Sequence, residues 1–424
     1  MCIISSMRLL SMFIARAFTL LALLSIYIVP LLLVSPQPAA AQSGMRELLE
    51  ARRLMVQEEI AAQGIENERL LEAMREVPRE QFIPLYKRNL AYLNLAVTYG
   101  DGQVILPPLV TAHLIEQLDP QKNDKVLVIG AGSGYSSALL SRMCREVYAV
   151  EIDRNVAATA EETLNRLKYT NVKLRVGDGF EGWQEHAPYQ RIIVECSPDS
   201  VPKPLVEQLA EGGVLLVPVG TEFDQTMHLC KKVNGELTTV SLWPTLLLPM
   251  KGKAEEFRSQ SEKLRTPSIL NGGFEEIVPK TTDVPASWAY VRQGRVITDS
   301  TCPEGKYSLS FINVTPGVAA TALQAFPVDG KSISELTLAC KIWGKEIRPG
   351  QNRQELPRVE VRFFDEKRRF VGGEWMGGWN MTFNWLPKEH VFSVPRTAKF
   401  ALLRIGLGGA TGEIRFDDFR LEYR

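Results

Sequence analysis

The chain has 424 residues, 45% of them hydrophobic, and its 49 basic residues are balanced by 49 acidic ones. This composition argues against an intrinsically disordered chain, which combines low hydrophobicity with high net charge. It also argues against a nucleic-acid partner, because proteins that bind nucleic acid carry a basic excess. At about 100–200 residues per domain, the length predicts two or three folded units.

Residues 1–41 are typical of a secretory leader. Two arginines precede an uncharged apolar run at 17–34, and the segment ends in three alanines. A positive start, an apolar middle and a small-residue end define a signal peptide. The sequence therefore predicts cleavage after Ala41 and export to the periplasm or cell envelope. An uncleaved membrane anchor is the alternative, and a true start at Met45 would leave a cytoplasmic protein.

Residues 46–77 have the apolar spacing of helices, interrupted at Gly64. Beyond Lys125, short apolar runs alternate with helical periodicity. The runs that predict strands are 126–129, 147–150, 172–176, 192–194 and 214–219. The intervening segments that predict helices are 136–143, 155–167 and 201–209. Strands that alternate with helices indicate a mostly parallel, doubly wound α/β sheet of Rossmann-like type.

The pattern changes after Met250. Residues 251–267 are polar and are interpreted as a linker. From 268 to 424, short alternating runs are separated by Gly, Pro, Asn and Asp, which predicts an all-β sandwich or jelly roll. The predicted organisation is a leader at 1–41, an α/β domain at 45–250, the linker and the β-sandwich domain.

A glycine-rich loop follows the first strand of the α/β region. Its residues are Gly130, Ala131, Gly132, Ser133 and Gly134. Glycines allow a ligand to approach the backbone, and a helix N-terminus offers free N–H groups. Glu151 ends the next strand, where a carboxylate can bind both ribose hydroxyls of a nucleotide. Tyr135 stands where a dinucleotide fingerprint needs its third glycine, so the loop favours a nucleoside with a cationic tail, such as S-adenosylmethionine.

Asp178-Gly179 ends the third strand, where the acid can accept a hydrogen bond from an adenine amino group; an ordinary Asp-Gly turn fits equally well. Neither the histidines nor the cysteines have metal-site spacing, so no metal is predicted. Cys302 and Cys340 fall in the same C-terminal region and could pair as a disulfide in an oxidising compartment, but buried free thiols are the favoured interpretation.

Several motifs within 46–250 resemble the protein-L-isoaspartate O-methyltransferase family. They are the Val-Pro-Arg of 77–79, the Phe-Ile-Pro of 82–84, the loop of 130–135, the Val-Glu-Ile of 150–152, the Gly-Asp-Gly of 177–179 and the Val-Pro-Val-Gly of 217–220. The resemblance implies S-adenosylmethionine as methyl donor and the isoaspartyl α-carboxylate of damaged proteins as acceptor. The methyl ester closes to a succinimide, which reopens partly to normal aspartate, so the implied role is protein repair.

The substrate loop departs from this family. Family members usually read Thr-Ile-Ser where this chain reads Val104-Ile105-Leu106, after Gln103, so both hydroxyls are lost. One hydrogen bond to a charged acceptor contributes about 1.5–3 kcal/mol. Gln103, Val104 and Leu106 are the candidate catalytic positions. The turn Glu195–Pro198 is also altered. Two alternatives therefore stay open: a methyltransferase for a different carboxylate, or a non-catalytic binding protein that uses the β-sandwich.

The C-terminal region resembles the jelly-roll modules related to carbohydrate-binding families, through residues 271–275 (NGGFE) and 412–421 (GEIRFDDFRL). The resemblance implies a carbohydrate or cell-surface ligand. The tryptophans considered for a sugar-stacking platform are Trp343, Trp375, Trp379 and Trp385. Trp375 and Trp379 lie in a loop-like, glycine-rich stretch, whereas a core position is preferred for Trp343. Glu275 with Asp417 or Asp418 occupies calcium-binding places of these relatives, exposed strand-end acids being the alternative.

Overall fold

The computed structural model describes residues 39–100, 102–258 and 266–424. The chain forms two compact units, Met1–Leu54 and Met55–Arg424. The apolar run of the predicted leader lies outside the described residues. In the described ranges, no helix is long and apolar enough to cross a membrane.

In the first unit the structure describes helix α2, Ala39–Leu54. Near its end, Arg53 pairs with Glu50 one turn earlier, at 2.7 Å between Nη2 and Oε1.

Short helices open the second unit. They are η2 (Met55–Ile60), η3 (Ala61–Gln63), α3 (Glu68–Glu76), η4 (Arg79–Phe82) and η5 (Leu85–Leu90). The predicted break falls at Gly64, whose φ of 94° is a left-handed conformation that favours glycine. Asn67 caps α3, because its side chain accepts a hydrogen bond from the Leu70 N–H at 3.2 Å.

A two-stranded hairpin, β1 (Val97–Tyr99) with β2 (Gln103–Ile105), leads into helix α4 (Pro108–Leu118). Pro108 suits the first turn of α4, where a missing N–H costs nothing. This hairpin and the start of α4 carry the predicted substrate loop, defined here as residues 102–108.

One seven-stranded sheet forms the α/β part, in the order β5-β4-β3-β6-β7-β8-β9. Its strands are β3 (Lys125–Ile129), β4 (Glu146–Glu151), β5 (Val172–Val176), β6 (Tyr189–Val194), β7 (Leu209–Gly220), β8 (Gln225–Val233) and β9 (Glu236–Thr245). The first five of these are parallel, and β8 and β9 extend the sheet in antiparallel fashion. The strand order reverses at β3, which places a switch point between β3 and β6.

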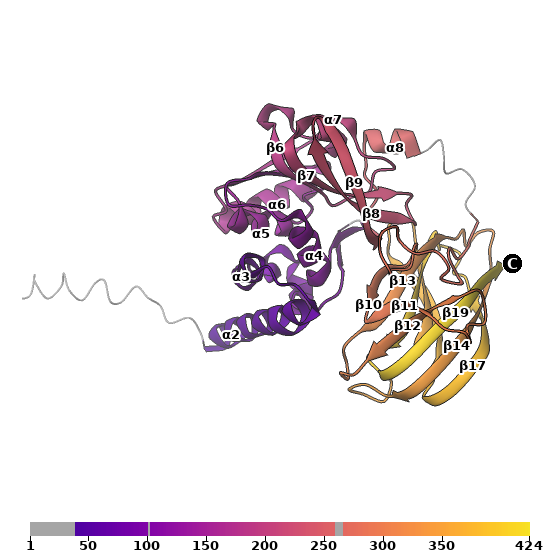
Figure 1. The fold of residues 1–424 in the computed structure, drawn as a ribbon. Helices are drawn as coiled ribbons and strands as arrows, with labels where there is room; N and C mark the ends of the chain where they lie inside the picture. Colours follow the sequence, from indigo (N-terminus) through magenta and orange to yellow (C-terminus); the bar gives the residue numbers. More distant parts are fainter. Residues whose placement is uncertain (1–38, 101, 259–265) are drawn as a thin grey trace, which may run out of the picture. The chain divides into compact units, whose positions relative to one another are not determined.

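Helices follow the strands as predicted. Helix α5 (Tyr135–Met143) and helix α6 (Arg154–Arg166) contact β4 and β5, and α7 (Lys203–Gln208) contacts β7. Short 3-10 turns η6 (Gly179–Glu181) and η7 (Gln184–His186) follow β5. Figure 1 shows helices α5, α6 and α7 together with the sheet strands β6, β7, β8 and β9. The predicted Rossmann-like class is therefore confirmed.

The predictions missed two features of this sheet. Strand β7 begins at Leu209, so it includes Gly212-Gly213 and starts five residues before the predicted strand at 214–219. The hairpin of β8 and β9 turns at Asn234-Gly235, with φ values of 53° and 82°. Asn-Gly is the sequence pair that tight hairpin turns favour, so this signal was available.

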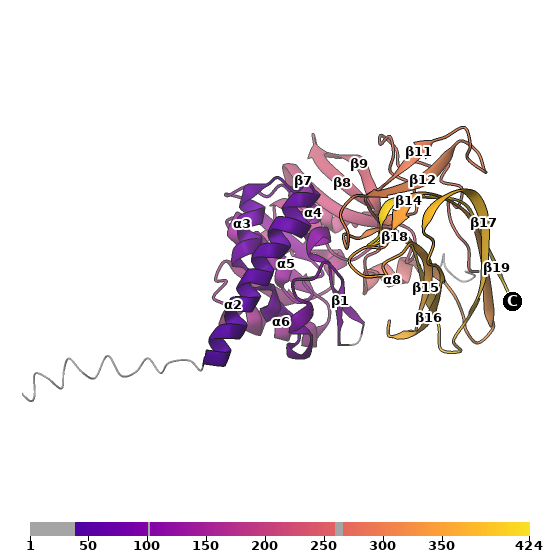
Figure 2. The ribbon, with the colours of Figure 1, turned by 90° about the horizontal axis from the view of Figure 1, so that it is seen from below.

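Two five-stranded antiparallel sheets form the C-terminal sandwich. One has the order β10-β13-β18-β15-β16 and the other β11-β12-β19-β14-β17. The strands are β10 (Ala289–Arg292), β11 (Gly294–Thr298), β12 (Tyr307–Asn313), β13 (Ala320–Pro327), β14 (Glu335–Arg348), β15 (Arg358–Phe364), β16 (Phe370–Gly377), β17 (Met381–Ser393), β18 (Phe400–Gly408) and β19 (Thr411–Tyr423). Figure 2 shows β14, β17 and β19 facing β15 and β16.

Alternating burial explains the sandwich. Every second residue of β13 and β15 is buried, which places one face of each strand in the core. The core contains Trp288, Phe311, Phe363 and Phe416, which are all fully buried. The predicted all-β sandwich is confirmed.

Several local expectations differ from the structure. Residues 370–377 form strand β16 rather than a loop, because they pair with β15. Cys302 and Cys340 are free thiols, which agrees with the favoured interpretation rather than with the disulfide. The segment interpreted as a linker contains helix α8, Lys253–Arg258.

Candidate active site

Four of the five residues in the glycine loop, residues 130–134, line a cavity of about 1280 Å³ at the carboxyl ends of the parallel strands. They are Gly130, Ala131, Gly132 and Ser133. Gly132 has a φ of 54°, which lets the loop turn with its backbone towards the cavity. The fifth, Gly134, packs against helix α6: a Cβ there would lie 3.3 Å from Leu164 Cδ1.

Glu151 ends β4 and lines the same cavity. It is 5% exposed. Its Oε2 accepts a hydrogen bond from the Gly132 N–H at 2.9 Å, and its Oε1 accepts one from the Asp153 N–H at 3.0 Å. The carboxylate thereby fixes the glycine loop, and each oxygen keeps a second lone pair for a ligand.

Asp178 and Gly179 are placed differently from each other. Gly179 lines the cavity, but Asp178 does not appear in its wall. The Asp178 carboxylate accepts hydrogen bonds from the N–H groups of Phe180 and Lys253, both at 2.9 Å. Lys253 opens α8, so the segment after the sheet returns to this acid. The structure therefore gives Asp178 a role in docking α8 and leaves it outside the cavity wall, so the contact with adenine stays a prediction.

The substrate loop faces the glycine loop across the cavity. Gln103, Val104 and Leu106 all line it. The buried Arg79 anchors this loop, because its Nη2 donates to the Leu106 carbonyl at 2.7 Å and its Nε to the Ala91 carbonyl at 2.9 Å. Arg79 belongs to the Val-Pro-Arg motif, so that motif has a structural purpose.

We expect Arg79→Met to lower the free energy of unfolding by about 2–4 kcal/mol, because two carbonyls lose a charged donor. Urea unfolding measures this loss. Arg75→Met is the control, since Arg75 pairs with Glu68 on the surface, where side chains are 45% and 72% exposed. Equal stability of the two variants would contradict the anchoring role.

Three polar groups of the site were missed by the sequence predictions. Tyr99 of β1 has a buried hydroxyl, and Glu195 after β6 has a buried carboxyl oxygen, Oε1; neither atom has a hydrogen-bond partner among the described residues. Burial, and then the nearby Glu151, raise the pKa of Tyr99, which keeps it neutral. Thr111 of α4 is 1% exposed and lines the cavity. The altered turn that begins at Glu195 is the sequence signal that points to this residue.

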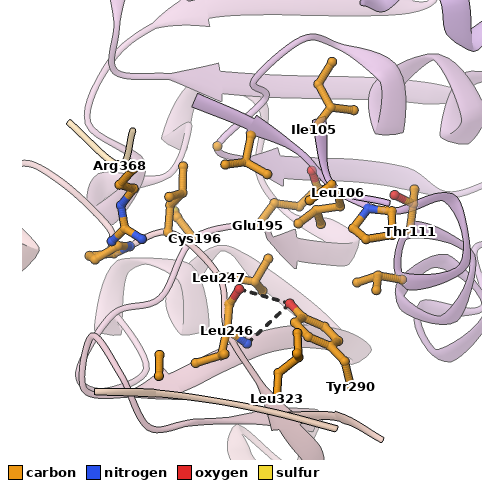
Figure 3. Close-up of a pocket in the computed structure, with 18 of the residues that line it drawn as sticks. Ile105, Leu106, Thr111, Glu195, Cys196, Leu246, Leu247, Tyr290, Leu323 and Arg368 are labelled. Atoms are coloured by element: carbon orange, nitrogen blue, oxygen red, sulfur yellow. Dashed lines mark hydrogen bonds between the residues drawn. The ribbon is translucent and has the colours of Figure 1, made fainter. Parts of the chain in front are cut away.

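Residues of the sandwich complete the cavity wall. They include Tyr290, Leu323 and Arg368, which Figure 3 shows in the same pocket as Leu106 and Glu195. The Tyr290 hydroxyl donates to the Leu246 carbonyl at 3.0 Å. Arg368 Nη2 pairs with Glu222 Oε1 at 2.7 Å. The β-sandwich is thus joined to the α/β part beside the site.

The acids proposed for calcium have protein partners instead. Glu275 accepts hydrogen bonds from the N–H groups of Lys306 and Tyr307, and Asp417 accepts one from the Glu304 N–H. Asp418 pairs with Lys341 at 3.1 Å. Within the described ranges, no cluster of three or more His, Cys, Asp or Glu residues could hold a metal ion.

The fold and the site together define a Rossmann-like α/β protein whose ligand edge lies at the switch point of its sheet. The family model described as "Protein-L-isoaspartate(D-aspartate) O-methyltransferase (PCMT)" matches residues 50–255.

The relatives agree with this match. A protein-L-isoaspartate O-methyltransferase 2 of Anaeromyxobacter sp. (strain Fw109-5) is 42% identical over 201 residues, which is 47% of this chain and 83% of the relative. A protein-L-isoaspartate O-methyltransferase of Gloeobacter violaceus is 40% identical over 197 residues, 46% of this chain and 96% of the relative. The chain belongs to the protein-L-isoaspartate O-methyltransferase family.

A solved structure of a protein-L-isoaspartate O-methyltransferase is also similar. It is 23% identical, covers 62% of this chain and 85% of its own, and superposes with a TM-score of 0.46.

Proposed function

We propose that this chain transfers the methyl group of S-adenosylmethionine to the α-carboxylate of isoaspartyl residues in damaged proteins. The observation that carries this assignment is that the glycine loop and the substrate loop line one cavity. The glycine loop and Glu151 form its donor side, and the substrate loop forms its acceptor side. Family membership supplies the reaction.

The reaction needs positioning rather than a base. The acceptor α-carboxyl has a pKa of about 3.3–3.7 and is ionised at neutral pH. Its oxygen attacks the sulfonium methyl carbon in line, the carbon–sulfur bond breaks, and the electron pair stays on sulfur. Apolar residues such as Leu106 and Leu247 line the cavity and exclude water from these charges.

The donor fits the loop side of the cavity. Glu151 provides carboxylate lone pairs at the end of β4, where ribose hydroxyls can donate to it. The backbone of Gly130 and Gly132 leaves space for the methionine tail of the donor. Ser133 and Ser136 add hydroxyls at the same wall.

The product identifies the activity. We expect a peptide with one isoaspartyl linkage to gain one methyl group, then to lose methanol as the succinimide closes, and to yield some of its aspartyl isomer. Mass spectrometry and chromatography of the reaction follow these three steps. A methyl group that enters a different residue, or a stable ester, would contradict the repair function.

A second candidate is a methyltransferase for a different carboxylate. Val104 and Leu106 favour it, because they replace the usual hydroxyls with aliphatic groups at the cavity wall. Comparison of the isoaspartyl peptide with small carboxylic acids as acceptors separates the two candidates: the second requires faster transfer to a small acid.

Export is also proposed, on the pattern of residues 1–41 alone. In an exporting bacterial host, we expect the chain in the periplasmic or envelope fraction, with Gln42 as its first residue by N-terminal sequencing. Recovery from the cytoplasm with a start at Met1 or Met45 would overturn this proposal.

We also propose that the sandwich is a jelly roll that binds carbohydrate or another cell-surface ligand. Two features support the proposal: successive strands cross between its sheets, and Trp375 of β16 is 52% exposed with Arg358 over its ring. Trp379 instead packs against the core, so the two do not form one platform.

For this ligand site we expect Trp375→Ala to abolish retention on insoluble polysaccharide while the melting temperature stays unchanged, since the ring is half exposed. Trp385→Ala is the control, because Trp385 already donates a hydrogen bond to Thr301 at 3.3 Å. Unchanged retention of the Trp375 variant would remove this residue from the proposal.

A further inference from the structure

Glu195 stands at the point where the two sides of the cavity meet. It follows β6, next to the switch point, and its N–H donates to the Ile129 carbonyl at 2.8 Å. Ile129 precedes the glycine loop, so the backbone of Glu195 is fixed beside the donor side. Its side chain lines the same cavity as Leu106 (Figure 3).

The carboxyl group of Glu195 is only partly satisfied. It has a hydrogen bond with the side chain of Ser136, in the first turn of α5. Its Oε1 is buried and has no hydrogen-bond partner among the described residues. A buried polar atom without a partner is costly, and in a cavity wall it indicates a missing ligand.

The acceptor side of the cavity lacks the hydroxyls that relatives use. Val104, Ile105 and Leu106 present only aliphatic side chains from the substrate loop. An acceptor carboxylate that enters here would lose hydrogen bonds with water and find no hydroxyl in that loop, where the Gln103 amide is the one polar side chain in the cavity wall. The unpartnered oxygen of Glu195 lies in the wall that the acceptor must approach.

We propose that Glu195, in its protonated form, donates a hydrogen bond to the acceptor carboxylate and so replaces the missing loop hydroxyls. This inference rests on the proposed function, because it assigns a residue to the acceptor of that reaction. The two carboxyl groups share one proton, as like-charged pairs in close contact do. Glu195 keeps this proton while the other acceptor oxygen forms the new bond to the methyl carbon.

The protonation state agrees with this role. Burial raises the pKa of Glu195 to about 7, and the hydrogen bond with Ser136 acts in the opposite direction. An incoming carboxylate would raise this pKa further, whereas the donor sulfonium would lower it.

Other titratable groups face Glu195. Tyr99 from β1 stays neutral, and Glu151 from β4 is fixed by backbone N–H groups. Burial and Arg292 lower the pKa of His113 from α4, although Glu116 opposes this, so His113 is neutral above pH 6.5. Glu222, Lys251 and Glu255 also line the cavity, from other segments. Glu195, whose pKa is raised to about 7, is therefore the group facing this part of the cavity that the pH test addresses.

The test is the pH dependence of kcat/KM on an isoaspartyl peptide, measured with the full chain. The pH dependence of kcat/KM reports the pKa values of essential groups in the free enzyme. The kcat/KM of the wild-type protein is expected to fall about tenfold per pH unit above pH 7. Glu195 then ionises, loses the O–H that donates the hydrogen bond, and repels the acceptor carboxylate. Glu195→Gln keeps an N–H donor at every pH, so its rate should stay within a few-fold of wild type at pH 6 and remain flat to pH 8.

Two further variants complete the test. Glu195→Ala should lose at least tenfold in kcat/KM at pH 6, and the exposed Glu185→Gln should keep the wild-type profile. The α-amino group of the donor titrates near pH 8, but equally in all variants. Calorimetric titration with S-adenosylmethionine checks that each variant folds and binds the donor.

The outcomes are distinguishable. A flat wild-type profile, or a Glu195→Gln variant as slow as Glu195→Ala, overturns the role of Glu195, and the latter result would indicate a carboxylate that must be ionised. If wild type binds the donor but transfers no methyl group at any pH, the proposed function itself fails.

Discussion

Glu151→Ala is expected to weaken the binding of S-adenosylmethionine by at least a hundredfold. Two charge-assisted hydrogen bonds to the ribose are lost, at about 1.5–3 kcal/mol each. The N–H groups of Gly132 and Asp153 lose their acceptor as well, so the glycine loop is no longer held in its binding conformation. Isothermal titration calorimetry measures the dissociation constant.

Glu146→Ala is the matched control for this experiment. Glu146 begins the same strand, but its carboxylate pairs with Lys173 at 3.4 Å on the surface. We expect donor affinity close to that of wild type. If the two variants bind the donor equally well, the nucleoside does not lie against the end of β4.

Restoring the hydroxyls of the substrate loop, as Val104→Thr with Leu106→Ser, is expected to raise kcat/KM for an isoaspartyl peptide ten- to a hundredfold. Each new hydroxyl can donate to the charged acceptor, which is worth about 1.5–3 kcal/mol before the cost of desolvation. The gain should appear mainly in KM, because the contact is made with the ground-state carboxylate as well.

The control for this gain is Val110→Thr. Val110 also lines the cavity, from α4, so the substitution adds the same hydroxyl outside the substrate loop. Rates are measured with both peptide and donor varied. A gain of equal size in the control would mean that added polarity, rather than the loop position, is responsible.

Much of the α/β fold could be predicted because local signals agree with it. Buried parallel strands are continuous apolar runs, and Ile129 followed by glycines marks the place where a strand gives way to a ligand loop. The glycine loop and Glu151 were found by spacing alone, and the structure brings them together in one cavity.

The parts that were missed depend on contacts between distant residues. Asp178 accepts a hydrogen bond from the N–H of Lys253, which is 75 residues away in the sequence. No local pattern in the sequence shows such a contact. The burial of Trp379 is likewise set by packing against the sandwich core. Strand β16 reads as a loop because of its glycines, but its pairing with β15 overrides that weak local preference.

Glu195 shows the same limit for the site. Its position after a strand could be read from the sequence, but the raised pKa of its carboxyl comes from burial by segments far along the chain. From the sequence alone, the lost hydroxyls at Val104 and Leu106 left open a weaker enzyme, a different carboxylate acceptor or a non-catalytic binding protein. The structure adds the carboxyl group of Glu195 to the same cavity, and this group is the proposed replacement for the lost hydroxyls.

The central claim is that this cavity recognises an isoaspartyl carboxylate. The most direct measurement is methyl transfer from labelled S-adenosylmethionine to two peptides that differ only in having an isoaspartyl or an aspartyl linkage. We expect kcat/KM to be at least a hundredfold higher for the isoaspartyl peptide. Equal transfer to both peptides, or donor binding without transfer to either, would contradict it.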